Sequence, residues 1–194
     1  MLLAAALVAG SATAATAQST ALKVNVLSPL VQTGSVSLER RLDPHRSVQL
    51  EALYTRWNGL DLVFPNPTSI RGFGLVPEYR EYLSTTAGAL QGVYLATFVR
   101  FRHLSLTTEY REASGTSQPL TVLVPATLTT YGGGVAVGYQ RLLRKRFTLD
   151  TYLGPSFDVG EVQPAASQPA GAGARTEMYQ GFKLRAGLTL GVAF

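Results

Sequence analysis

The chain has 194 residues, of which 46% are hydrophobic and only 15% charged, and its formal net charge is +5. The length fits one domain. Because cysteine is absent, disulfides and thiolate metal sites are excluded. Basic residues are spread along the chain, apart from the run at 141–146 in an expected turn, whereas nucleic-acid binding needs them gathered on one surface. We therefore expect no nucleic-acid partner.

The first residues predict a secretory signal peptide over 1–17. Residues 2–9 form an apolar core, and Ala15-Thr16-Ala17 supplies the small side chains of a cleavage site. One feature departs from the usual pattern, since no Lys or Arg precedes the apolar core. After it, no apolar run approaches the roughly 20 residues that a membrane-spanning helix needs. We expect 18–194 to be a single exported domain.

The remaining chain contains eight segments in which apolar and polar residues alternate, the period typical of a β-strand with two different faces. At Pro77, in the segment 70–83, we expect a β-bulge, because proline lacks the N–H that the hydrogen-bond ladder of a strand uses. In 181–194 every even position is apolar. The eight segments span 21–31, 35–42, 46–57, 70–83, 92–106, 129–141, 146–160 and 181–194.

The connections between these segments differ in length in an ordered way. On one side of the predicted barrel, the connections at 43–45, 84–91 and 143–145 are short. On the other side, the connections at 58–69, 107–128 and 161–180 are long, and only the connection at 31–34 is short. Short turns on one side and long loops on the other are typical of transmembrane barrels. The predicted fold is an all-β, eight-stranded, antiparallel up-and-down transmembrane β-barrel.

Alternation alone also fits a soluble carrier barrel that turns its apolar face inward. The polar face favours the membrane barrel, because it mixes small residues with opposite charges, as a narrow lumen of limited volume requires. We interpret these charges as mutually neutralising pairs, with an ion path as the alternative, and expect a carboxylate–guanidinium pair among Glu78, Arg80, Arg100 and Arg102. The expected lumen charges are Lys23, Glu39, Arg41, Glu51, Glu78, Arg80, Arg100, Arg102, Asp150, Asp158, Lys183 and Arg185.

Two resemblances support this interpretation. The strand ending on Phe194 resembles the closing strand of bacterial outer-membrane barrels, in which a terminal Phe is an assembly signal, which implies the barrel assembly machinery as a partner. Segments 21–25, 39–42, 47–50 and 71–80 resemble a family of largely uncharacterised small outer-membrane barrels of Gram-negative bacteria. The resemblance implies an outer-membrane location in contact with lipid, and it implies no functional residue.

One catalytic arrangement is worth testing. His103 and Ser105 share a strand face, which resembles lipid A deacylases of the outer membrane, and Glu109 has the parity of a third, acidic member. Two features oppose this hypothesis: Glu109 falls in an expected loop, and Leu106 stands where that family usually has Asn. We favour a non-enzymatic, interfacial role for His103 and Ser105. The other histidine, His45, lies in a turn without metal partners, so we expect neither metal nor cofactor.

The long connections are the places where contact with other molecules is possible. Residues 164–174 are rich in Pro, Ala and Gly and are expected to be mobile. Leu120, Val122 and Val124 form an apolar stretch in the 107–128 connection, and we predict that 119–125 is either an interaction loop or an extension of a strand. The sequence thus favours a small integral outer-membrane barrel with a structural or interaction role, with a lipid hydrolase and a narrow channel as alternatives.

Overall fold

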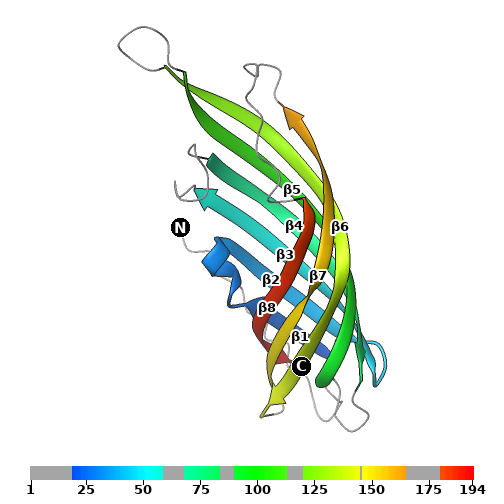
Figure 1. The fold of residues 1–194 in the computed structure, drawn as a ribbon. Helices are drawn as coiled ribbons and strands as arrows, with labels where there is room; N and C mark the ends of the chain where they lie inside the picture. Colours follow the sequence, from blue (N-terminus) through cyan, green and yellow to red (C-terminus); the bar gives the residue numbers. More distant parts are fainter. Residues whose placement is uncertain (1–18, 59–67, 84–89, 113–119, 145, 165–179) are drawn as a thin grey trace.

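In the computed structural model, residues 19–58, 68–83, 90–112, 120–144, 146–164 and 180–194 are described; the predicted signal peptide lies outside them. The strands form one closed barrel in which β1 pairs with β8 and every neighbouring pair is antiparallel (Figure 1). This confirms the predicted eight-stranded up-and-down barrel. The elements are β1 Thr20–Asn25, a 3-10 turn η1 Ser28–Val31, β2 Thr33–Arg41, β3 Arg46–Asn58, β4 Thr68–Tyr82, β5 Gly92–Glu112, β6 Leu120–Leu143, β7 Phe147–Pro164 and β8 Gly181–Ala193.

The alternation in the sequence becomes an inside-out distribution of side chains. On β8, Phe182 is 75% exposed, whereas Arg185 and Thr189 are buried in the lumen. The same distribution occurs on the other strands, where charged side chains such as Lys23, Glu39 and Arg80 are buried and many large apolar ones are exposed. No helix in the described ranges has the length and apolar character to cross a membrane. The exposed apolar residues include Leu22, Val24, Leu38, Leu50, Leu75, Val99, Val137, Leu153 and Leu190.

The outer surface has the height of a bilayer core. On β7, Phe147 and Phe157 are both exposed and bracket the outward-facing Leu153. Ten residues of strand span roughly 33 Å, which becomes roughly 25 Å along the barrel axis at a tilt of about 40°. An apolar band of about 25 Å flanked by aromatic residues is what transmembrane barrels present to lipid. The exposed aromatic residues of the outer surface include Tyr54, Tyr79, Tyr131, Tyr139, Phe147, Phe182 and Phe194.

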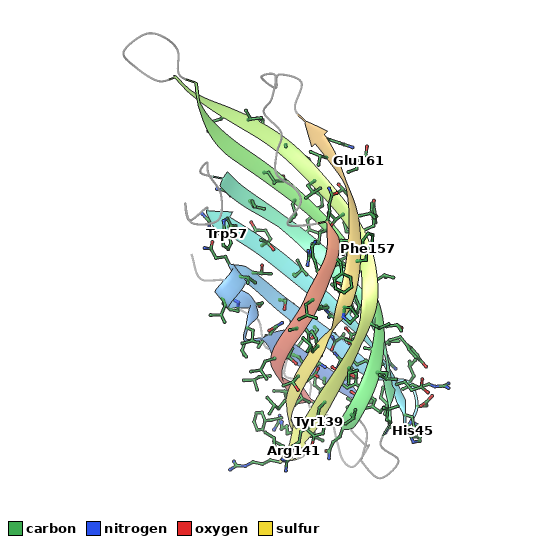
Figure 2. All side chains as sticks on the ribbon, in the orientation of Figure 1. His45, Trp57, Tyr139, Arg141, Phe157 and Glu161 are labelled. Carbon is green, nitrogen blue, oxygen red and sulfur yellow. The ribbon has the colours of Figure 1, made fainter. Side chains whose placement is uncertain are left out.

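The two ends of the barrel differ. At one end, which we call the turn end, β2 joins β3 by a short turn. The C-terminal residue, Phe194, lies at the same end and exchanges backbone hydrogen bonds with Thr20. At the other end, the loop end, β5 and β6 rise well above β1 and β2, so that the rim is slanted (Figure 1). His45, Tyr139 and Arg141 lie near the turn end, and Trp57 lies near the loop end (Figure 2).

Several strand boundaries differ from the prediction. The segment expected to be a strand to residue 31 ends at Asn25, where the side-chain oxygen accepts a bond from the Leu27 amide at 3.0 Å and the carbonyl accepts one from the Ser28 hydroxyl at 2.9 Å. These local bonds compete with the ladder, and Pro29 cannot donate to it. The chain therefore turns into η1 instead of continuing up the wall.

The prediction of a long loop over 107–128 is wrong, because most of these residues belong to strands. β5 continues to Glu112 and β6 begins at Leu120, so Glu109 lies in β5 opposite Leu123. Of the expected interaction segment, Val124 is 3% exposed, and the side chains of Leu120 and Val122 lie outside the description. Strand extension, the alternative reading, is what the structure contains. Of the third long connection, 161–164 belongs to β7, and the segment expected to be mobile lies almost wholly beyond the described residues.

The bulge expected at Pro77 is also wrong. Pairing of β4 with β5 lapses at Val76 and Pro77, yet Leu75 pairs with Phe101 and Glu78 with Phe98, so the register is unchanged across the gap. On the other side, Pro77 pairs normally with Leu50 of β3. The missing N–H is accommodated by omitting ladder bonds on one side of the strand, without an inserted residue.

Candidate functional site: the lumen charge clusters

Five polar side chains fill the lumen near the turn end and form what we call the turn-end cluster: Lys23, Glu39, Arg80, Gln140 and Asp150. Lys23 Nζ donates to Glu39 Oε2 at 2.7 Å and to Asp150 Oδ2 at 3.1 Å. Arg80 Nη1 donates to Asp150 Oδ2 at 2.8 Å and lies 3.6 Å from Glu39 Oε2. With two cations facing two carboxylates, the cluster is electrically balanced.

Gln140 and three hydroxyl groups complete the coordination of these charges. The Gln140 amide donates to Glu39 at 3.0 Å, and its oxygen accepts from Lys23 at 2.9 Å. The hydroxyl groups of Tyr82 and Ser47 donate to Glu39 at 2.8 and 2.5 Å, and that of Tyr94 donates to Asp150 at 2.7 Å. A buried ion is costly unless it is paired and hydrogen-bonded, and these contacts meet that condition.

The turn-end cluster closes the lumen. Its five side chains are inaccessible to solvent, because none of them exposes more than 1% of its surface. The Arg80 guanidinium also lies 4.3 Å from the centre of the Tyr94 ring. Apolar side chains pack among the charges, including Leu90 and Val76. This half of the interior is a packed core.

Glu78 and Arg185 connect this cluster to the half of the barrel nearer the loop end. Glu78 accepts from Arg80 Nε at 2.6 Å and from Arg185 Nη1 at 2.6 Å, and Arg185 Nη2 donates to Glu51 at 3.0 Å. The Arg185 guanidinium is held between two rings, 4.3 Å from that of Phe98 and 4.6 Å from that of Tyr152. These contacts fix the arginine in the centre of the lumen.

A second group, the loop-end cluster, consists of Arg100, Arg102, Asp158 and Lys183. Arg100 donates to both oxygens of Asp158, at 2.6 and 2.8 Å, and Lys183 Nζ donates to the same carboxylate at 3.0 Å. Arg102 is half-buried and lines the cavity beside Arg100. Arg100 and Lys183 thus share the carboxylate of Asp158.

Above the turn-end cluster, the lumen opens into a cavity of about 580 Å³. Its inner wall includes Glu51, Arg100, Arg102, Tyr152 and Arg185, and its outer end is formed by η1 and Trp57. The interior therefore has two parts, a closed half at the turn end and a hollow half at the loop end.

The structure brings most of the predicted lumen charges together. The carboxylate–guanidinium pair expected among Glu78, Arg80, Arg100 and Arg102 forms between Glu78 and Arg80. Arg41 does not join: it is half-buried near the rim of the turn end and makes no ion pair with another described residue. Sequence reasoning missed Gln140, Tyr82 and Tyr94, although all three occupy inward-facing positions of their strands.

The arrangement proposed for a hydrolase does not assemble in the described part of the barrel. His103 Nδ1 lies 3.1 Å from the Thr129 hydroxyl, and its ring lies against Phe73. Ser105 is exposed on the same face, and the side chain of Glu109 lies outside the description. Within the described residues no carboxylate contacts His103, and no group of three potential ligands is placed to hold a metal ion.

Comparison with known proteins places the chain among sequences of unknown function. Residues 2–163 match the family model described as "Protein of unknown function (DUF3575)". No curated protein matches the sequence. Among solved structures, the N-terminal β-barrel domain of Pseudomonas aeruginosa OprF is similar at 12% identity and a TM-score of 0.37, covering 91% of this chain and 98% of that chain. Acinetobacter baumannii CarO is similar at 11% identity and a TM-score of 0.44, covering 92% and 97%.

Proposed function

The chain belongs to that family of proteins of unknown function, DUF3575, and from its own geometry we propose a role for it. It is an integral outer-membrane barrel of a Gram-negative bacterium that neither conducts ions nor catalyses a reaction, and it presents its loop end to other molecules of the envelope. The observation that carries this proposal is the turn-end cluster, a balanced set of buried ions inside an apolar shell.

The location follows from the two surfaces of the wall. An exposed apolar band with a charged interior is stable only where lipid surrounds the barrel. The short connections at the turn end suit the periplasmic side, and the tall β5–β6 pair suits the outside. The partners proposed on this basis are outer-membrane lipid and the barrel assembly machinery, to which the exposed ring of Phe194 at the turn end is available.

The packing of the turn-end cluster argues against a channel. An ion could pass only if Lys23, Arg80 and their carboxylates separated, and each would then be an unpaired charge in a narrow interior. The contacts of His103 argue against a hydrolase, since its ring nitrogen is bonded to Thr129 on the neighbouring strand. A structural or interaction role is what remains.

Single-channel recording tests this proposal. The purified protein in a planar bilayer is expected to give no conductance steps at voltages that the bilayer tolerates. The positive control is a variant with Tyr94→Ala and Gln140→Ala, which removes two groups that fill the closed half of the lumen and is expected to give small steps. Steady conductance of the unmodified protein would refute a closed barrel.

The loop end offers a surface for an envelope or extracellular protein partner. Thr108 is the last residue of β5 that pairs with β4, and Ala126 is the first residue of β6 that pairs with β7. Above these two residues, the described parts of β5 and β6 pair only with each other and form a two-stranded ribbon. Leu123 in this ribbon is exposed. A photo-crosslinking residue at Leu123 should give a discrete protein adduct in intact cells, whereas the same residue at the exposed Leu143 of the turn end should not give that adduct. Identical products at both positions would exclude the ribbon as the surface that contacts the partner.

A further inference from the structure

The outer face of the barrel carries a groove that crosses β2, β3, β4 and β5. We propose that this groove binds one phospholipid, with an acyl chain in the groove and the phosphate group at Arg40 beside the turn end. This inference goes beyond the proposed function, because it concerns the lipid-facing wall and neither the closed lumen nor the loop end. It requires only that the barrel lies in a membrane.

The strand register aligns the lining of the groove in two rows across the wall. The side chains of both rows point out of the barrel and are exposed. In the second row, farther from the turn end, Leu38 pairs with Leu50 and Leu50 with Pro77. The row nearer the turn end consists of Arg40, Val48, Tyr79 and Thr97, each paired with the next.

The groove is deep because two of the side chains that line it are small. These are Pro77 and Thr97, which lie on the neighbouring strands β4 and β5. Gln49, Glu78 and Phe98 also line the groove although they are buried in the lumen, so the backbone of three strands forms its floor. Pairing of β4 with β5 lapses beside Pro77, at the same place. The volume of about 630 Å³ lies in the range of small-molecule sites.

The groove leads from the rim at the turn end toward the middle of the wall. Arg40 precedes the last residue of β2, whereas Thr97 lies well inside β5, which begins at Gly92. Three steps of about 4.8 Å between neighbouring strands give a length of about 14 Å. One leaflet supplies half of a hydrocarbon core that is about 30 Å thick. The groove therefore has the length to hold an acyl chain of a lipid whose headgroup lies at the rim.

Arg40 supplies a positive charge at the rim end of the groove. Its side chain is exposed, and its neighbours across the strands, Thr20 and Val48, are uncharged. Among the described residues, no acidic side chain forms an ion pair with Arg40. A guanidinium group donates to phosphate through paired hydrogen bonds, and a long arginine side chain reaches the headgroup region from an apolar surface.

The charge of Arg40 also favours a phospholipid over a second copy of this chain. Two copies in one membrane would meet through the same surface about a two-fold axis, which places both Arg40 side chains at the same height. Like charges that face each other across an interface oppose association. A phosphate group offsets the charge of Arg40, and a flexible acyl chain adapts to the shape of the groove.

Native mass spectrometry tests this binding. The mature protein, delipidated in detergent, is titrated with dioleoyl phosphatidylglycerol, and one saturable lipid adduct is expected. Dioleoylglycerol, which has the same chains and no phosphate, should require at least a tenfold higher concentration for half saturation. Glycerol 3-phosphate, which has no chain, should give no adduct over the same range. Absence of a saturable adduct, or equal binding of either control compound, would overturn the proposal.

Two arginine variants locate the phosphate group. Arg40→Gln should raise the half-saturating concentration about tenfold, as the loss of a charge-assisted hydrogen bond implies. Arg141→Gln is the matched control, because Arg141 is also an exposed arginine near the turn end but lies on β6, outside the groove (Figure 2). It should bind as the unmodified protein does. Equal weakening by both substitutions would place the phosphate elsewhere and overturn the assignment.

Two threonine variants test the groove itself. Thr97→Phe fills it and should raise the half-saturating concentration at least tenfold, whereas Thr151→Phe, at an exposed threonine of β7, should have no effect. Heat-modifiable migration of each variant verifies that the barrel is folded. Unchanged binding by folded Thr97→Phe would overturn the proposal, as would a dimer that Thr97→Phe abolishes, which would assign the groove to a second copy.

Conductance recording on the same preparation separates this inference from the proposed function. A folded barrel that gives no conductance steps and retains no lipid would overturn the lipid site and leave the closed barrel standing. A conducting barrel that retains one lipid through Arg40 would do the reverse.

Discussion

Asp150→Asn should destabilise the barrel strongly, because it removes one charge from a balanced and fully buried set. Asp150 accepts from Lys23 at 3.1 Å, from Arg80 at 2.8 Å and from Tyr94 at 2.7 Å. The amide has nearly the same volume, so no cavity is created and the effect is electrostatic. Breaking a buried pair in this way costs about 3–5 kcal/mol, which is a large part of the total stability of a domain of this size.

A double-mutant cycle with Lys23→Met distinguishes pairing from general damage. Lys23→Met alone leaves Arg80 as the one cation of the turn-end cluster against its two carboxylates, whereas the double variant leaves Arg80 and Glu39 and restores the balance within the cluster. The double variant should therefore lose about 1–3 kcal/mol less than the sum of the two single losses.

Urea titration in phospholipid vesicles, followed by the fluorescence of Trp57, measures each free energy of unfolding. Asp43→Asn is the matched control, because Asp43 lies in an exposed turn 3.9 Å from Arg46 and should change stability by less than about 0.5 kcal/mol. Strictly additive losses for the two lumen variants would refute the argument that Lys23 and Asp150 are energetically coupled.

Three further expectations test the two faces of the wall and the outer surface. Leu153→Arg, on the exposed face midway along the apolar band, should cost about 2–4 kcal/mol in vesicle unfolding, and tolerance of the arginine would contradict a lipid contact. Gly138→Ala should cost about 1–3 kcal/mol in the same titration, because its Cβ would lie 2.2 Å from the Tyr94 ring. Gly34→Ala is the control and should not destabilise the barrel, because its Cβ would have nothing within 4 Å, and equal effects of the two substitutions would contradict the packing of the closed half. Replacing His103 and Ser105 by alanine should leave the lipid A of overexpressing cells unchanged in mass spectra, and a deacylated species that disappears with this variant would establish the hydrolase instead.

The extent of β5 and β6 shows where sequence periodicity stops being informative. Inside the apolar band, one face contacts lipid and the other the lumen, so Val99 and Phe101 alternate with Arg100 and Arg102. Beyond it, residues 107–112 are polar except for Tyr110, so the apolar residues that mark one face of a strand are missing. The hydrogen bonds continue although the alternation ends, and for that reason the strand ends were predicted too early.

The termination of β1 has a different cause. Val24 and Val26 continue the apolar alternation, and periodicity predicts a strand through Val31. Short-range bonds around Asn25 and the proline of η1 end the strand in spite of that pattern. Local competition of this kind involves single side chains, which a period-two pattern does not register.

The sequence by itself determined the fold class, the number of strands, the face that each side chain occupies and the presence of a charged lumen. These properties depend on a period of two between two solvents, which is a local property of the chain. Only the tertiary structure decided which charges meet, since Lys23 and Asp150 are 127 residues apart and come together through the closure of the barrel. It also decided that one half of the lumen is filled and the other hollow, because side chains from all eight strands share that volume, and their packing follows from the register of every strand pair at once.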